Sequence, residues 1–211
     1  MTEPPAHRVP PPAELLPAFV NTYDVDLAEP EQLPDPAALT AWLRSQNLLA
    51  GGASPAADAP FAYSSPGSPG SPGSSAATDD DLVLAHELRA GLRQAMRQHH
   101  DGDLATLVPE LDRAAARLPL RVTFAGTAPS LAPAGTGVVG ALAALVAAVA
   151  SAQADGSWQR LKLCAAQDCA WAFLDSSKNR SRHWCSMGSC GNRQKTRAYR
   201  ARQKAADRMD G

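Results

Sequence analysis

All four cysteines of this 211-residue chain fall within 27 consecutive residues. They form two pairs of equal spacing, Cys164-x4-Cys169 and Cys185-x4-Cys190, with fifteen residues between the pairs. Each pair can supply two thiolates from one tight turn, and the segment between them can bring the turns together around a tetrahedral metal ion. The spacing therefore predicts one structural Zn²⁺ held by these four side chains. Disulfides are the alternative, and a reducing cytosol disfavours them.

Four thiolates leave no open position on zinc for water or substrate, so we expect a structural ion rather than a catalytic one. The cysteine-containing segment is too short for a substantial hydrophobic core. Zinc binding contributes on the order of 10 kcal/mol of folding free energy in peptides of this kind. The metal is therefore expected to hold the segment folded.

The residues between the cysteine pairs predict a β-hairpin. Residues 169–175 fit a short strand, residues 176–181 have turn chemistry, and residues 182–185 fit the returning partner strand. A helix is then expected to begin near Cys190 and to run to about residue 206, with Ser186 or Ser189 as its cap. A cysteine knuckle, a hairpin and a helix that starts at the last ligand form a treble-clef-like zinc module.

The formal net charge of −1 conceals an asymmetry along the chain. Residues 1–159 hold 8 Lys/Arg and 17 Asp/Glu, whereas residues 160–211 hold 12 and 4. No carboxylate lies between Asp175 and Asp207. This pattern indicates a polyanion-binding module joined to an acidic part. The alternative is that the acidic part neutralises the basic one, within the chain or in a dimer.

The basic segment predicts a nucleic-acid surface on a helix. Four of its residues, spaced four, three and four apart from Arg193 to Lys204, lie along one stripe of a helix, and Lys195 and Arg202 form a second row. Such a face suits phosphate contacts, and a helix fits the major groove of DNA. A merely solvated charged face is the alternative. With the basic residues of the turn, the predicted surface consists of Lys178, Arg180, Arg182, Arg193, Lys195, Arg197, Arg200, Arg202 and Lys204.

Other classes of function are weaker. RNA binding is the runner-up, because the aromatics Trp171, Phe173, Trp184 and Tyr199 could stack on unpaired bases, although small zinc modules usually need their aromatics as core. The module could also grip an acidic protein partner. No paired carboxylates, Ser/His/Asp set or open metal site can be assigned, so we do not expect an enzyme.

The first 155 residues predict a mainly α-helical domain with a small β element. Short helices are expected within residues 13–49, one of them capped by Asp35, and longer ones at residues 79–100, 104–118 and 138–154. Residues 120–124 alternate apolar with polar and are the best strand candidate. Residues 1–12 and a Ser/Pro/Gly-rich insertion at about residues 51–78 are expected to be disordered.

Several motifs in this part are better explained by structure than by chemistry. The G-x-G-x-x-G pattern from Gly135 to Gly140 follows a Pro-rich stretch and reads as a loop and helix start, not as a dinucleotide site. The pair His99-His100 suits the end of a helix. The apolar run at residues 138–152 is shorter than the about 20 residues that span a bilayer. With no secretory signal visible, a cytoplasmic protein without membrane contact is expected.

The sequence Cys190-Gly-Asn-Arg193, preceded by Trp184-Cys-Ser-Met187 and followed by Lys195, Tyr199, Arg200 and Arg202, resembles the CGNR zinc-finger family. These are bacterial proteins regarded as stress-induced transcription regulators. The resemblance covers about residues 158–204. Their usual N-terminal partner, the mainly helical ABATE domain, is resembled less specifically at residues 19–22 and 35–43.

The resemblance implies a division of the chain into an ABATE-like domain at residues 13–155, which contains the insertion, and a CGNR-type finger at residues 158–206. Gly191, Asn192 and Trp184 stand beside zinc ligands and are expected to brace the metal site. Contact with adenine is the alternative for Asn192.

The expected function is a zinc-dependent regulator that binds double-stranded DNA through its C-terminal helix. The N-terminal domain would then sense a small-molecule effector or bind a protein partner. A homodimer is compatible with the sequence, since one small finger offers little specificity.

Overall fold

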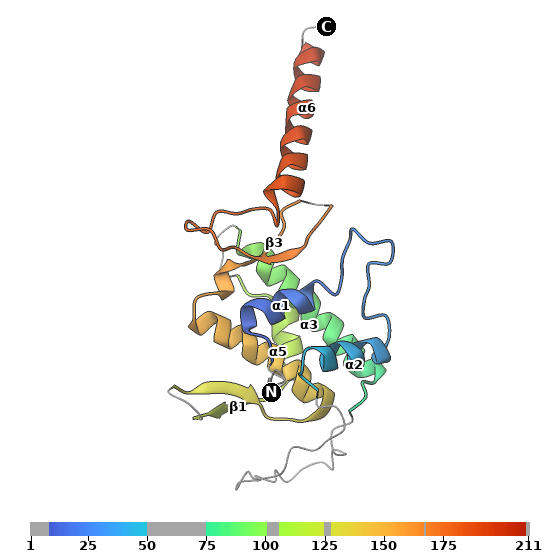
Figure 1. The fold of residues 1–211 in the computed structure, drawn as a ribbon, viewed down its shortest axis with the longest axis vertical. Coiled ribbons are helices and arrows are strands. Elements are labelled where there is room, and N and C mark those ends of the chain that lie inside the picture. The colour runs from blue at the N-terminus through green and yellow to red at the C-terminus, as the bar shows by residue number, and fades with distance from the viewer. Residues whose placement is uncertain (1–8, 50–74, 101–105, 125–127, 167, 210–211) are drawn as a thin grey trace, which may run out of the picture.

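The computed structural model describes residues 9–49, 75–100, 106–124, 128–166 and 168–209. A body of packed helices carries a small β-hairpin at each end, and one long helix projects from it (Figure 1). The prediction of a mainly α fold is confirmed. The expected disorder at residues 1–12 and 51–78 falls mostly on residues 1–8 and 51–74, which lie outside the described ranges.

Five helices form the body: α1 (Pro12–Val20), α2 (Pro36–Ser45), α3 (Asp79–Gln98), α4 (Pro109–Ala116) and α5 (Gly137–Ala154). Three of them carry proline in the first turn, where the ring's fixed φ suits the helix and no hydrogen-bond donor is lost. The helices agree with those predicted, except that α4 is shorter than residues 104–118.

Side-chain caps set where two of these helices begin. Asp35 accepts a hydrogen bond from the Ala38 N–H at 2.7 Å and starts α2. Thr78 and Asp81 form a reciprocal capping box at the start of α3. Each cap satisfies backbone N–H groups that the first helical turn leaves without a partner.

The hydrophobic core lies between α1, α3 and α5, which are packed side by side in Figure 1. Helix α5 is apolar over nearly its whole length, with Leu142 and Leu145 fully buried. By length and composition α5 could also cross a membrane, but the core helix of a soluble protein has the same properties. Gly91 lets α3 approach α4 closely, since a Cβ there would lie 2.7 Å from the Leu111 backbone.

The first hairpin pairs β1 (Leu120–Thr123) with β2 (Ser130–Pro133), antiparallel, with Leu120 opposite Pro133. The sequence predicts a small β element in this part of the chain, and the hairpin lies against α5. The loop after β2 leads into α5. A Cβ added to Gly140 would lie only 2.5 Å from the carbonyl oxygen of Gly135 in this loop. Gly140, the last glycine of the G-x-G-x-x-G pattern, thus allows the loop to pack closely on the helix.

The second hairpin pairs β3 (Leu161–Leu163) with β4 (Ala172–Leu174) and follows the single turn η1 (Trp158–Arg160). The prediction that residues 182–185 pair with the strand at residues 169–175 is therefore wrong, because β4 pairs with β3. Cys164 and Cys169 lie in the loop between β3 and β4, so the knuckle itself closes the hairpin. Residues 182–185 run alongside as irregular chain, where the His183 carbonyl accepts a hydrogen bond from the Ala165 N–H at 2.8 Å.

The second hairpin is built into the body. Leu161, Leu163 and Ala172 belong to the same buried cluster as the helices. The Asn21 side chain pairs with the backbone of Ala172 in both directions, at 3.0 and 2.7 Å, and so acts as an extra strand residue beside β4. On the other side, the ring N–H of His99 donates to the Leu161 carbonyl at 2.7 Å, which confirms a structural part for this histidine.

Candidate metal centre and nucleic-acid interface

The four cysteine sulfurs lie within 4.8 Å of one another. The Sγ atoms of Cys169 and Cys185 are 3.7 Å apart, and so are those of Cys185 and Cys190. Four thiolates placed tetrahedrally at a Zn–S distance of 2.3 Å have sulfurs about 3.8 Å apart. The sulfur positions therefore fit one tetrahedral zinc ion, and no described side chain other than these cysteines joins the cluster.

Burial sets the acidity of these thiols. It raises the pKa of Cys169 well above the ordinary range of a thiol and that of Cys185 to about 11, because an apolar environment disfavours the thiolate. At Cys190 burial acts in the same direction, but hydrogen bonds from Cys169, Cys185, Ser189 and Arg193 outweigh it and lower the pKa. Zinc binding therefore displaces protons from Cys169 and Cys185, whose buried environment favours the neutral thiol.

Cys190 lies in η2 (Met187–Gly191), a wide helical turn that leads directly into α6 (Asn192–Met209). Ser186 caps this turn by accepting a hydrogen bond from the Ser189 N–H, which agrees with the predicted cap. The last zinc ligand therefore stands at the base of α6, so the metal fixes the position and direction of the helix.

The three residues expected to brace the zinc site make packing and backbone contacts beside the cysteines. Trp184 packs against the buried cysteine cluster. The Asn192 amide donates to the Gly188 carbonyl at 3.3 Å, and the Gly191 N–H donates to the Ser186 carbonyl at 3.0 Å. These bonds shape the turn that carries Cys190.

A brace that sequence reasoning missed is Arg193. Its guanidinium lies 3.4 Å from the Cys190 Sγ and pairs with Asp168 at 3.4 Å. Asp168 also accepts from Arg197 at 2.9 Å. The signal in the sequence is an arginine three residues after a cysteine at a helix start, a spacing that brings the two side chains together.

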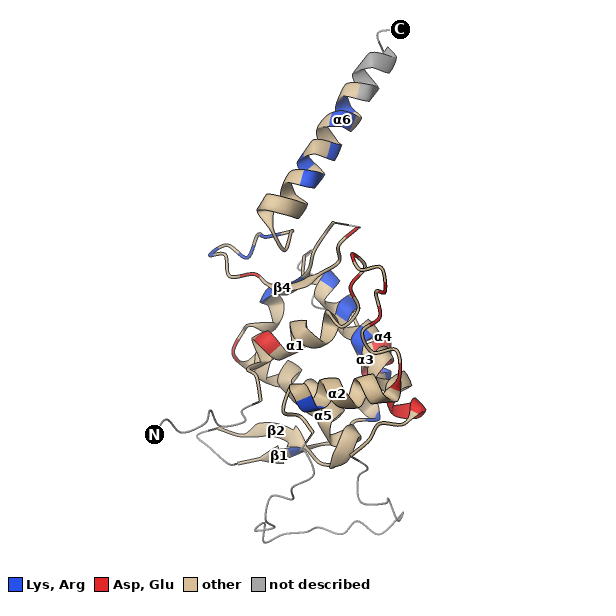
Figure 2. Ribbon diagram, turned by 45° about the vertical axis from the view of Figure 1, so that its right-hand side comes forward, with Lys and Arg blue, Asp and Glu red and all other residues tan. Residues whose placement is uncertain are grey.

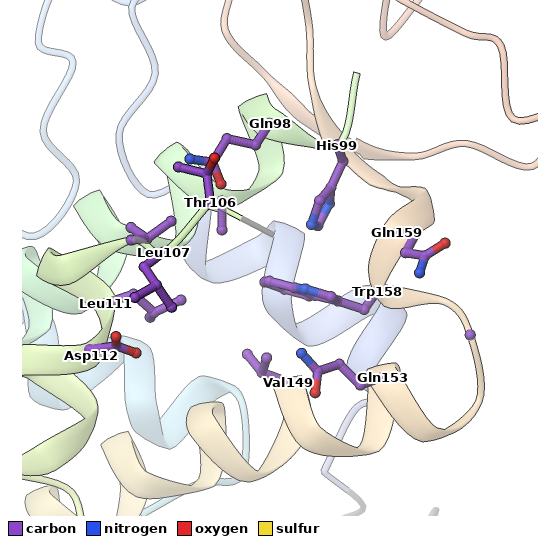
Figure 3. A pocket seen from close by; sticks show the side chains of 13 residues that line it. Gln98, His99, Thr106, Leu107, Leu111, Asp112, Val149, Gln153, Trp158 and Gln159 are labelled. Atoms are coloured by element: carbon purple, nitrogen blue, oxygen red, sulfur yellow. The ribbon is translucent and has the colours of Figure 1, made fainter. Parts of the chain in front are cut away.

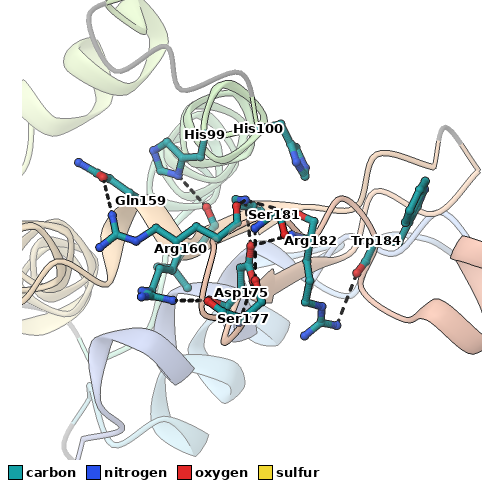
Figure 4. A network of polar contacts seen from close by, with 12 residues as sticks. His99, His100, Gln159, Arg160, Asp175, Ser177, Ser181, Arg182 and Trp184 are labelled. Carbon is teal, nitrogen blue, oxygen red and sulfur yellow. Dashed lines mark hydrogen bonds and ion pairs between the residues drawn. The ribbon is translucent and has the colours of Figure 1, made fainter.

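A buried ion pair stabilises the loop between the cysteine pairs. The Lys162 ammonium lies 3.0 Å from the Asp175 carboxylate, and both side chains are almost completely buried. Asp175 also accepts from the Ser177 hydroxyl and from the Arg182 backbone, as Figure 4 shows. Although burial favours the neutral acid, these hydrogen bonds and Lys162 hold the pKa of Asp175 far below its usual range.

Helix α6 projects from the body and carries most of the predicted basic surface (Figures 1 and 2). Every described side chain from Lys195 to Gln203 is exposed. Lys195, Arg200 and Arg202 form no ion pair within the described part of the chain, whereas Arg193 and Arg197 share Asp168. The side chain of Lys204 lies outside the described set.

The three residues of the predicted surface that lie in the loop before α6, Lys178, Arg180 and Arg182, differ from one another in exposure. Lys178 is exposed. Arg180 is exposed too but donates to the Gln159 side chain at 3.1 Å. Arg182 is half-buried, with its guanidinium 5.1 Å from the centre of the Phe173 ring and hydrogen-bonded to the Cys185 carbonyl. The structure thus separates Arg182, which supports the metal site, from the solvent-facing residues.

Two family models match the chain. The CGNR zinc finger matches residues 160–203. The ABATE family, described as "Putative stress-induced transcription regulator", matches residues 14–175, more than half of the sequence. The chain belongs to the ABATE family. Its CGNR finger contains the four-cysteine cluster, and the prediction of one structural zinc ion is confirmed.

The two matches overlap at residues 160–175, the segment that holds β3 and β4. This overlap agrees with the packing, since the hairpin belongs both to the body of this ABATE protein and to its finger. Both families are regulator or zinc-finger types. No curated protein matches the chain.

Proposed function

We propose that this ABATE protein is a cytoplasmic, zinc-dependent transcription regulator that binds double-stranded DNA through α6. The observation that carries the proposal is the placement of α6: it is anchored at a zinc ligand and projects as a basic helix whose described side chains include no carboxylate. A projecting helix of this width fits the major groove, and its positive charge favours release of the counterions bound to DNA.

The basic residues divide by what they contact within the protein. Lys195, Arg200 and Arg202 face solvent without an ion-pair partner among the described residues, and we assign them to phosphate or base contacts. Arg193 and Arg197 share one carboxylate, Asp168, and we assign them to orienting the helix on the finger. Lys178 and Arg180 lie in the loop beside the finger and extend the surface.

The body carries no set of residues that we assign to catalysis, and we propose that it senses an effector or binds a partner. We divide the chain as residues 13–155 and 158–206, with the β3–β4 hairpin packed into both. Because Leu161 and Leu163 are buried in the main core, tests of DNA binding require the full chain.

Alanine variants on α6 test the assignment. Arg200→Ala should weaken binding to duplexes of any sequence and reduce the slope of log affinity against log salt by about 0.9 if it contacts one phosphate. Gln203→Ala, on the same exposed helix, is the matched control and should bind like the parent. Equal binding by the parent and by an Arg200→Ala/Arg202→Ala double variant would exclude α6 as the DNA-binding element.

RNA remains the second candidate because of one observation. Tyr199 on α6 is 57% exposed and Trp171 beside the zinc site is 39% exposed, so both rings can reach a ligand. Aromatic side chains in nucleic-acid modules stack on unpaired bases. Preference for single-stranded RNA over duplex DNA, lost in Tyr199→Ala, would favour this second candidate.

A further inference from the structure

A cavity of about 380 Å³ lies between α3, α4, α5 and η1, at the junction of the helical body and the finger. Figure 3 shows the Trp158 ring on one side of it, with Leu107 and Leu111 across from it and Val149 below. The volume falls within the range of pockets that bind small molecules, roughly 300–1,000 Å³. An aromatic wall opposite aliphatic side chains suits a flat, apolar ligand.

The polar groups around this cavity favour hydrogen-bond donors and positive charge. Asp112 supplies a carboxylate, and no lysine or arginine is among the described lining residues. His99 donates its Nδ1–H to the Leu161 carbonyl, which leaves Nε2 as the acceptor of a neutral ring. Gln98 and Gln153 add carboxamides.

The cavity is connected to the finger through η1. Gln159 lines the cavity, and its side-chain oxygen accepts from Arg180 at 3.1 Å. The next residue, Arg160, donates to the carbonyls of Asp175 and Ser177 in the finger loop, both at 3.0 Å (Figure 4). In Figure 3 the Gln159 side chain points away from the Trp158 ring, so η1 stands between the cavity and the finger loop.

We infer that this cavity binds a small aromatic amine. The ammonium group pairs with Asp112, and the ring lies between Trp158 and the aliphatic side chains opposite it. This inference rests on the proposed function for its consequence, since it names the class of effector that the body senses. The binding itself does not depend on that function.

Calorimetric titration of the zinc-loaded full chain tests the site, with tryptamine as the probe. Saturable binding at one site is expected, with indole-3-acetate at least tenfold weaker because its carboxylate meets Asp112. Asp112→Asn should weaken tryptamine at least fivefold and leave neutral indole unchanged. Glu110→Gln, an acidic residue on the same helix that does not line the cavity, is the matched control.

Three results would overturn the site. They are absence of tryptamine binding, equal binding of tryptamine and indole-3-acetate, and unchanged binding in Asp112→Asn. Val149→Trp adds a check on location, since the larger ring fills the cavity and should abolish binding. Should that variant fail to fold, the Asp112→Asn comparison still decides, because Asp112 is exposed and not part of the core.

Failure of the site and failure of the proposed function are distinguishable, because tryptamine binding is measured without DNA. If tryptamine binds as expected but no form of the protein binds DNA, the proposed function fails and the inferred site stands.

Discussion

Arg193 lies against one of the four cysteines of the zinc site. Its place in a basic run predicts a DNA contact, and its position one turn after Cys190 also brings it to the sulfur. A guanidinium beside a thiolate stabilises the charged form, and Asp168 holds the guanidinium in place. The pattern of charge along a sequence predicts a surface, but only the path of the chain shows which charges already have a partner.

Arg193→Ala should therefore weaken zinc binding by about 10- to 100-fold, the usual effect of removing a group that orients a metal ligand. Competition with a chromophoric chelator measures the zinc affinity. Arg200→Ala is the control and should bind zinc like the parent. If Arg193→Ala keeps full zinc affinity and loses DNA binding as Arg200→Ala does, Arg193 is a DNA contact after all.

Asp175→Asn should destabilise the finger by about 3–5 kcal/mol, because it leaves the Lys162 ammonium buried without its partner charge. Urea unfolding of the zinc-loaded protein, followed by tryptophan fluorescence, measures the loss. Lys162→Met with Asp175→Leu, which removes both charges, should be less destabilised than either single change. A single variant with the parent's stability would show that the ion pair is unimportant.

His99 should make stability depend on pH. Burial lowers its folded-state pKa, and Lys162 and His100 add to this, while the bond to the Leu161 carbonyl opposes it. The unfolded state therefore takes up a proton first as pH falls below about 6.5. Stability is then lost at up to about 1.4 kcal/mol per pH unit until the folded pKa is reached.

Urea unfolding at pH 7.5 and 5.5 measures this slope in the parent and in His99→Gln, which keeps a donor but does not titrate. The difference between the two pH values should be smaller in the variant. An equal difference in both proteins would assign the slope to other groups.

The elements of this protein differ in how far local sequence determines them. The caps at the starts of α2 and α3, and Pro36 in the first turn of α2, act within four residues, so these helices could be predicted. The pairing of β4 with β3 could not be predicted, because β3 is three residues long and places a lysine inside the protein. Lys162 is tolerated there only because Asp175, thirteen residues away, meets its charge. The cysteine spacing identified the ligands, whereas the cavity involves four separate elements and leaves no local pattern.

Helix α6 should be only marginally stable in the free protein. Its exposed side chains from Lys195 to Gln203 bury no apolar surface, and isolated helices of this length are marginal in water. Hydrogen exchange should show weak amide protection over residues 199–209 that rises at least tenfold with duplex DNA, while α5 stays protected in both states. Strong protection of residues 199–209 without DNA would point to a different partner, such as a second copy of the chain.

At the scale of the whole molecule, the acidic and basic parts of the chain are kept apart. Among the described residues, the ion pairs of α6 all involve Asp168 of the finger, and of the body's carboxylates Asp26 acts on the charge of Arg193 at the base of the helix. Lys195, Arg200 and Arg202, farther along α6, form no ion pair with described residues of the body. Charge separation of this kind leaves a basic helix available to a polyanion while the body carries the opposite sign.

Zinc removal should affect the two parts unequally. The finger's own buried cluster is small and consists largely of the cysteines, whereas α1, α3 and α5 share an extensive apolar core. Cys169→Ser should lose zinc and the order of residues 176–209, and the body should keep its cooperative thermal transition. Complete loss of that transition would mean that the β3–β4 hairpin is essential to the body as well.

The most direct test of a metal-organised DNA reader is fluorescence anisotropy of a mixed pool of labelled duplexes, titrated with the zinc-loaded full chain at two salt concentrations. The account predicts binding that weakens steeply with salt and disappears when a strong chelator removes the zinc. Absence of binding at low salt by folded, zinc-loaded protein, or binding that persists after zinc is removed, would contradict it.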